Sequence, residues 1–205
     1  MVRTERSHIL IANNFNIEDW ELEDRVEEII NLAETANAEI SGITLQKLKK
    51  PARTYLGLGK LSEAKDQVIQ ERANLIIVDD ELSPNQQRYL EDLFKIKVVD
   101  RTALILDIFA NRAKSREGRL QVSLAQFEYL LPRLAGQWSH LERLGGGIGT
   151  RGPGETQIET DRRLVRNSIK KIKKDLEKIK ISRSAQRSKR LKRAFNISLV
   201  GYTNA

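Results

Sequence analysis

The chain has 205 residues, of which 40% are hydrophobic and 31% are charged, and its formal net charge is +8. It contains no cysteine, which excludes disulfides and thiolate metal sites. No apolar run approaches the roughly 18 residues of a membrane span, and the first run, Ile9 to Ala12, is too short for a signal peptide. We therefore expect a cytoplasmic protein with one large domain or two small ones.

The positive charge is concentrated in one segment. Residues 161–193 contain 15 Lys and Arg and 3 Asp and Glu, a net charge of +12, and the rest of the chain has a net charge of −4. A charge run of this kind is either the solvated face of a helix or a surface that binds a polyanion. The sequence thus predicts a mildly acidic body with one strongly basic arm.

Strand and helix patterns alternate through residues 1–113. Apolar runs predict four strands, at Ile9 to Ala12, Glu39 to Leu48, Asn74 to Asp79 and Ile96 to Val99. Helical patterns separate them, over residues 20–33 and 60–73, after Ser83 and after Asp100, and the last two residues suit helix N-caps. This alternation predicts an α/β fold with a small, mostly parallel sheet and flanking helices.

From Arg116 onward the apolar residues follow a heptad spacing. One series runs from Leu120 to Leu141 and the other from Val165 to Ile179, with alternating steps of four and three residues. This spacing is typical of helices that pack with a 3.5-residue repeat. Residues 114–193 are therefore predicted to form a long antiparallel two-helix, coiled-coil-like hairpin. Roughly 28 residues at 1.5 Å per residue give an arm of about 40 Å.

The predicted tip of this hairpin is the loop at residues 145–155. It contains six glycines and a proline, at Gly145, Gly146, Gly147, Gly149, Gly152, Pro153 and Gly154. Exposed backbone N–H groups with little side-chain bulk suit close approach to phosphate or sugar. Polar and basic side chains accompany them, at Arg143, Thr150, Arg151, Arg162 and Arg163. Because arginine binds phosphate bidentately and stacks on bases, the sequence predicts an RNA contact here, with a flexible linker as the alternative.

Two short motifs in the α/β part carry weaker signals. Gly57, Gly59 and Lys60 precede a predicted helix, as in a small phosphate loop, but they match neither a dinucleotide fingerprint nor a P-loop. An ordinary turn is the alternative. Asp79, Asp80 and Glu81 follow a buried strand, where α/β sheets often place ligands. These acids would hold a metal, or they would cap the next helix and face water.

The remaining candidates are structural in this interpretation. His8 and His140 lack a Ser, Cys or paired carboxylate at a suitable spacing, and Trp138 occupies a heptad position. No catalytic residue is therefore predicted. Near the end of the chain, residues 195–200 resemble a buried strand. The next five residues, Gly201, Tyr202, Thr203, Asn204 and Ala205, match the first five positions of G-x-x-x-x-G-K-[ST] or simply end a strand.

Four segments of the chain resemble the HflX-type GTPase family. They are LGGGIGTRGPGETQIETDRR at residues 144–163, DDELSPNQ at 79–86, VDRTALILDIFANR at 99–112 and QVSLAQFEYLLPRL at 121–134. The resemblance covers nearly the whole chain. It implies an α/β N-terminal subdomain at residues 1–113, the hairpin at 114–193, and at 194–205 the first strand and partial P-loop of a Ras-like G domain.

The same resemblance implies a function. The chain is expected to bind the large ribosomal subunit and its ribosomal RNA, with the loop at 145–155 inserted toward the peptidyl-transferase region. The full-length protein would use GTP and Mg²⁺ to split or rescue stalled ribosomes, with Gly201 to Ala205 opening the GTP-binding loop. This chain alone is expected to be a monomer. It is expected to bind neither GTP nor Mg²⁺ tightly and to lack GTP hydrolysis.

Two alternatives remain at this point. In one, the α/β part is itself a nucleotide site, for ATP by analogy with the family, built from Gly57 to Lys60 and Asp79 to Glu81. In the other, the hairpin is a coiled-coil module that docks a protein.

Overall fold

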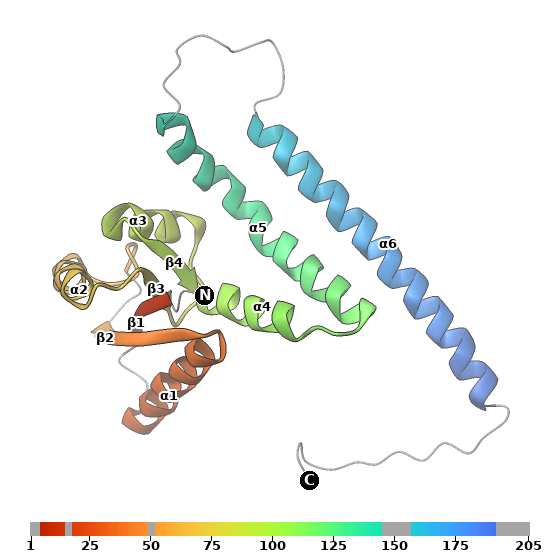
Figure 1. The fold of residues 1–205 in the computed structure, drawn as a ribbon, viewed down its shortest axis with the longest axis horizontal. Helices are drawn as coiled ribbons and strands as arrows, with labels where there is room; N and C mark the ends of the chain where they lie inside the picture. Colours follow the sequence, from red (N-terminus) through yellow and green to blue (C-terminus); the bar gives the residue numbers. More distant parts are fainter. Residues whose placement is uncertain (1–4, 15–17, 49–51, 145–156, 192–205) are drawn as a thin grey trace.

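The structure, a computed structural model, describes residues 5–14, 18–48, 52–144 and 157–191 (Figure 1). Its elements, in chain order, are β1 (Glu5–Asn14), α1 (Asp19–Thr35), β2 (Ala38–Leu48), α2 (Leu58–Glu71), β3 (Leu75–Val78), α3 (Pro84–Phe94), β4 (Lys97–Asp100), α4 (Arg101–Arg112), α5 (Arg116–Leu144) and α6 (Gln157–Leu191).

The four strands form one parallel sheet in the order β2-β1-β3-β4. Helices separate successive strands and cover the sheet, as parallel pairing requires. The predicted α/β fold with a small parallel sheet and flanking helices is therefore confirmed.

The sheet is buried on both faces. Side chains along β1 alternate between two hydrophobic clusters, because successive residues of a strand point to opposite faces. Leu10 packs with Leu61 of α2 and Leu90 of α3, whereas Ile9 packs with side chains of α1 and α4 that include Ile29. The result is a three-layer arrangement with α2 and α3 on one face and α1 and α4 on the other.

Two helix starts are set by the residues that the sequence predicts. Ser83 Oγ accepts a hydrogen bond from the Gln86 backbone N–H at 3.3 Å, and Gln86 Oε1 accepts one from the Ser83 N–H at 3.0 Å. This is the predicted capping box. Asp100 Oδ1 accepts from the Ala103 N–H at 2.8 Å and so caps α4.

A bulge interrupts the pairing of β1 with β2. Ser7 pairs with Ile40 but His8 pairs with Gly42, so the register shifts by one residue. A Cβ on Gly42 would collide with the carboxylate of Glu71, which approaches the backbone there. That carboxylate lies 2.8 Å from Nδ1 of His8, which is fully buried. His8 thus belongs to the polar interior.

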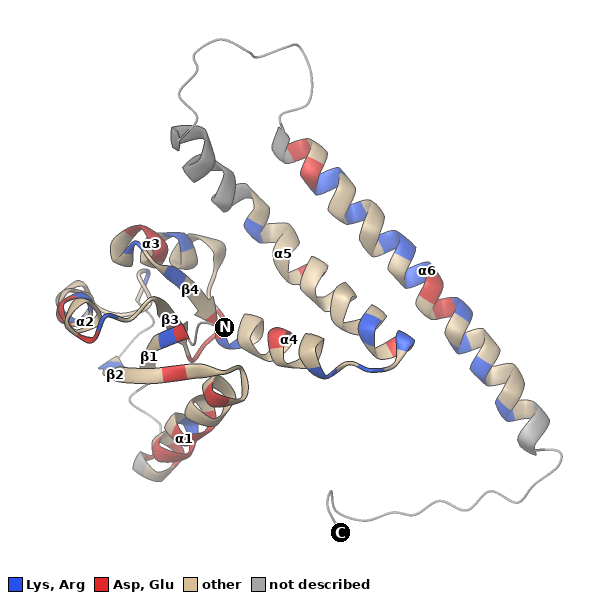
Figure 2. Cartoon of the chain, viewed as in Figure 1, with Lys and Arg blue, Asp and Glu red and all other residues tan. Residues whose placement is uncertain are grey.

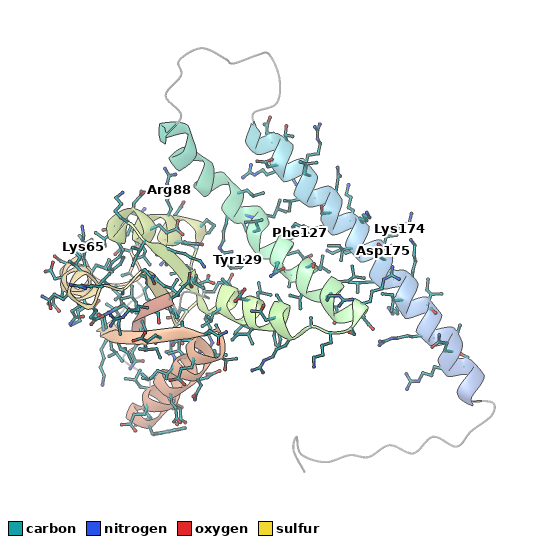
Figure 3. All side chains as sticks on the ribbon, viewed as in Figure 1. Lys65, Arg88, Phe127, Tyr129, Lys174 and Asp175 are labelled. Atoms are coloured by element: carbon teal, nitrogen blue, oxygen red, sulfur yellow. The ribbon has the colours of Figure 1, made fainter. Side chains whose placement is uncertain are left out.

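Helices α5 and α6 pack side by side and antiparallel (Figure 1). Glu128 pairs with Lys173 at 2.8 Å, and further along the arm Glu117 pairs with Arg183. Ile172, in the second heptad series, is buried between them. Phe127 projects toward α6, whereas Tyr129 projects from the other side of α5 toward the α/β unit (Figure 3). No helix in the described ranges is long and apolar enough to cross a membrane.

Candidate nucleic-acid interface

The arm is attached to the α/β unit through Arg133 of α5, which is only 6% exposed. Its Nη2 donates to the Leu82 carbonyl at 2.6 Å and to Asp100 Oδ2 at 3.2 Å. Its Nε donates to Gln87 Oε1 at 3.1 Å, and the guanidinium stacks on the Tyr129 ring at 3.5 Å from the centroid. A planar guanidinium suits such a set of contacts, because its five donors lie in a fixed fork. The root of α5 is therefore held in place.

Most of the basic side chains of the arm lie on α6 and face solvent. Figure 2 shows the contrast between this helix, where blue predominates, and the mixed charges of the α/β unit. The exposed cations of α6 are Arg163, Arg166, Lys170, Lys171, Lys173, Lys174, Lys178, Lys180, Arg183 and Arg187.

Some of these cations pair with acidic side chains among the described residues. Lys173 and Arg183 pair across to α5, and Lys178 pairs with Asp175 at 3.1 Å. The Lys178 hydrogen bond holds the pKa of Asp175 below its usual value, so that this acid stays ionised. Within the described part of the chain, Arg166 and Lys174 have no acidic partner. Lys174 lies on the side of α6 away from α5 (Figure 3). The positive charge of Lys174 therefore points into solvent, away from α5.

The first turns of α6 form a shallow basic hollow. It is lined by Glu159, Arg162, Arg163, Arg166, Asn167 and Lys170. Arg162, Arg166 and Lys170 follow one another at four-residue steps, so they lie one above the other on the helix surface. Like charges at this spacing repel by about 0.2–0.5 kcal/mol per pair. A bound polyanion would relieve that repulsion and accept charge-assisted hydrogen bonds.

Of the predicted interface, the described residues include Arg162 and Arg163. The loop at residues 145–155 lies outside the described residues, and Arg143 lies in the last turn of α5, where the backbone alone is described. Residues 201–205 also lie outside them. Arg166 and Lys170 were not predicted as site residues. Their four-residue spacing from Arg162 is the sequence signal that identifies them.

In the weaker phosphate-loop candidate, Gly57 and Lys60 make contacts with nearby side chains. Gly57 is the N-cap of α2, and its N–H donates to Gln46 Oε1 at 2.7 Å. Lys60 pairs with Glu63, one turn further along the helix, at 2.8 Å. Gly59 has open space around its Cα. In the structure these three residues form the start of α2.

The acidic candidates are held by arginines from two helices. Asp79 is buried and accepts hydrogen bonds from Arg25 of α1 at 2.6 Å and from Arg101 of α4 at 2.8 Å. No group of three or more metal-binding side chains occurs in the part of the chain that the structure describes. The pairing of Asp79 with two cations accounts for its position at the end of β3.

Asp80 also pairs with Arg25, at 3.3 Å, and it faces a tyrosine with an unusual backbone. Tyr55 has a φ of 75°, a backbone conformation that residues other than glycine rarely adopt. Its hydroxyl accepts from the Ala12 N–H at 3.0 Å and donates to Asp80 Oδ2 at 2.8 Å. Burial, together with the charge of Asp80, raises the pKa of Tyr55 well above its ordinary value, so the phenol stays protonated.

A small hollow opens beside this pair at the carboxyl end of the sheet. Its volume is about 220 Å³, and its lining consists of Ala12, Arg25, Leu48, Ala52, Tyr55, Asp80, Glu81 and Gln86. Gly57, Gly59 and Lys60 are not among these described lining residues. Of the two parts of the predicted nucleotide site, this hollow is lined by residues of the acidic part, Asp80 and Glu81.

Two family models and several curated proteins match the sequence of this chain. The family model "GTP-binding GTPase N-terminal" matches residues 23–110, and "GTP-binding GTPase Middle Region" matches residues 112–190. The GTPase HflX of Caldanaerobacter subterraneus subsp. tengcongensis is 50% identical over 207 residues, covering 100% of this chain and 48% of that protein. The GTPase HflX of Escherichia coli K12 is 47% identical over 198 residues, covering 96% of this chain and 46% of that protein.

A solved structure is also similar. The crystal structure of the SsGBP and GDP complex superposes with a TM-score of 0.62 at 26% identity, over 88% of this chain and 46% of that one. The chain spans about half the length of the curated relatives it matches. From the two family models and from about 50% identity along nearly its whole length, the chain belongs to the HflX family of GTPases.

Proposed function

We propose that this chain is the ribosome-binding part of an HflX-type GTPase, and that its α5–α6 arm binds ribosomal RNA of the large subunit. The observation that carries the proposal is the outward face of α6, where Arg166, Lys170 and Lys174 have no acidic partner among the described residues. RNA is the polyanion of a ribosome, and neutralising its phosphates releases counterions and drives association.

The arm is suited to reach into RNA. Its root is fixed by Arg133, so the position of the α/β unit determines where the two helices point. Helix α6 has 35 residues, which correspond to about 50 Å at 1.5 Å per residue. We propose that the Gly-rich loop at 145–155 makes the closest contact, with Arg151 and the basic start of α6 binding phosphate.

The whole protein would combine this contact with GTP. We propose that it hydrolyses GTP with Mg²⁺ in the half that follows this chain in its relatives, and that this splits or rescues ribosomes in the cytoplasm. Residues 201–205 would open the GTP-binding loop. Hydrolysis would also need the lysine and the hydroxyl residue with which that motif ends.

Co-sedimentation with isolated ribosomal subunits tests the proposal. The chain is expected to pellet with large subunits and to remain in the supernatant with small subunits. Replacing Gly146, Gly147 and Arg151 together by alanine should abolish pelleting while the circular dichroism spectrum stays the same. Unchanged pelleting of this triple variant would remove the loop from the proposed interface.

The α/β unit as a nucleotide site is the second candidate, and its geometry supports it less. Lys60 pairs with Glu63, and Asp79 is neutralised by Arg25 and Arg101. Calorimetry with ATP and with GTP separates the two. Saturable heat that disappears in Lys60→Ala would favour this candidate, and no heat would favour the RNA-binding arm. Capture of a protein partner without any RNA binding would support a protein-docking coiled coil instead.

A further inference from the structure

An apolar groove lies between α4 and the first half of α5. Its volume is about 560 Å³, and its apolar walls come from Ile105, Leu106 and Phe109 of α4 and from Val122 and Ala125 of α5. Phe109 is 55% exposed, although a phenyl ring on a helix usually packs into the core. An apolar surface of this kind marks an interaction site when it lies open on a soluble domain.

The groove belongs to neither of the surfaces described above. It lies on α4 and α5, whereas Arg166, Lys170 and Lys174 lie on α6. Its one cationic wall residue, Arg112 at the end of α4, has no acidic partner within the described ranges. Apolar walls with a single arginine at the edge do not suit the phosphate backbone of RNA. They suit a protein surface with an apolar centre and an acidic rim.

The course of α6 indicates which protein surface this is. Arg183 of α6 pairs with Glu117, the residue before Gly118 of the groove wall. Helix α6 continues only to Leu191, about 12 Å further at 1.5 Å per residue. The chain therefore leaves the arm at the end where the groove opens. In the relatives, which are about twice as long, the N-terminal and middle regions matched here are followed by further sequence.

We infer that this groove seats the GTP-binding half that follows α6 in HflX-family proteins, with Phe109 inserted into an apolar patch and Arg112 pairing with an acidic residue at its rim. Such a contact would hold the GTP-binding half against α4 and α5 and leave the outward face of α6 free. The inference rests on family membership and on the groove, and it does not depend on RNA binding by the arm.

Hydrogen exchange tests it in a fused protein. The chain is joined at its last aligned residue to the remaining half of the Caldanaerobacter relative, and exchange in residues 101–125 is compared with that in the 205-residue chain. Exchange is expected to slow about tenfold or more on fusion, because a docked surface opens less often. Phe109→Lys should abolish the slowing. Ile69→Lys should keep it, because Ile69 is similarly exposed, at 65%, but lies on α2.

Three results would overturn the inference. The first is equal exchange in the fused and the shorter protein. The second is slowing that persists in Phe109→Lys although its circular dichroism matches that of the parent. The third is a concentration-dependent dimer of the 205-residue chain, seen by sedimentation and lost in Phe109→Lys, since a second copy would then be the occupant. None of these results affects co-sedimentation with large subunits, so the two proposals fail separately.

Discussion

The guanidinium of Arg133 in α5 donates a hydrogen bond to the carboxylate of Asp100 at the end of β4, with 3.2 Å between Nη2 and Oδ2. Both side chains are buried. The same carboxylate caps α4 through the Ala103 N–H and accepts from the Leu82 N–H at 3.0 Å. One ion pair thus joins the sheet, the loop after β3, the start of α4 and the arm.

Removing Arg133 should therefore destabilise the protein strongly. Arg133→Met would leave Asp100 as an uncompensated buried charge and the Leu82 carbonyl without its donor, at a cost of about 3–5 kcal/mol in unfolding free energy. Urea unfolding measures this. Arg88→Met is the matched control, because Arg88 is exposed on α3 and its contact with Asp92 is 3.9 Å long. A loss below about 0.5 kcal/mol in Arg133→Met would show that this pair does not hold the arm.

The second prediction concerns Tyr55 at alkaline pH. The folded state raises the pKa of this phenol through burial and the charge of Asp80. Above about pH 10 the unfolded chain releases the phenolic proton while the folded chain retains it. The unfolding free energy should therefore fall as pH rises, by about 1.4 kcal/mol per pH unit for this one proton.

Urea unfolding of the parent and of Tyr55→Phe, at several values between pH 8 and about pH 11, isolates this contribution. The variant should be less stable at pH 8, because the Ala12 N–H loses its acceptor. The difference should shrink above pH 10. Tyr129, whose pKa burial also raises, continues to contribute in both proteins. A difference that is constant with pH would contradict the assigned protonation of Tyr55.

The third prediction separates packing from surface charge in the arm. Ile172→Ala should cost about 2–5 kcal/mol, because a buried isoleucine leaves a cavity. Lys173→Ala should cost less than about 1 kcal/mol, because its pair with Glu128 is exposed on both sides. Leu164→Ala, at an exposed position of α6, is the control for side-chain size. Amide exchange along α6 reports the loss, and equal effects at Ile172 and Leu164 would contradict the packing described.

The fourth prediction concerns the salt dependence of ribosome binding. Arg166→Ala and Lys170→Ala should each weaken binding to large subunits and reduce the slope of log affinity against log salt by about 1. Lys65→Ala, on α2 far from the arm (Figure 3), should change neither quantity. An unchanged slope in both α6 variants would place the RNA contact elsewhere.

Features set by neighbouring residues could be predicted from the sequence. The buried β3 strand, the Ser83 capping box and the Asp100 cap each depend on a few adjacent positions. The parallel sheet could also be predicted, because an alternation of strands and helices leaves few other topologies. The extent of β1 was underestimated, since its polar first residues, such as Glu5 and Arg6, carry no apolar signal but still pair with β2.

Features that depend on distant residues could not be predicted. The burial of Arg133 requires Leu82 and Asp100, which lie 51 and 33 residues away in sequence. In the sequence, Asp79 is one of three adjacent acidic residues. Its two arginine partners, Arg25 and Arg101, come close to it only in the folded chain. The groove at Phe109 could not be predicted, because it depends on how α4 and α5 pack against each other. In the sequence, these segments show only an ordinary helix pattern followed by a heptad series.

RNA cleavage from a probe placed on the protein tests directly whether the tip of the arm binds RNA of the large subunit. The chain contains no cysteine, so a single introduced cysteine gives a unique attachment site for an iron chelate that cleaves nearby RNA. With the probe at Gly146→Cys, large-subunit RNA should be cut in the peptidyl-transferase region, and with the probe at Lys65→Cys those cuts should be absent. No cleavage from Gly146, or the same cleavage pattern from both positions, would contradict binding of large-subunit RNA by the tip.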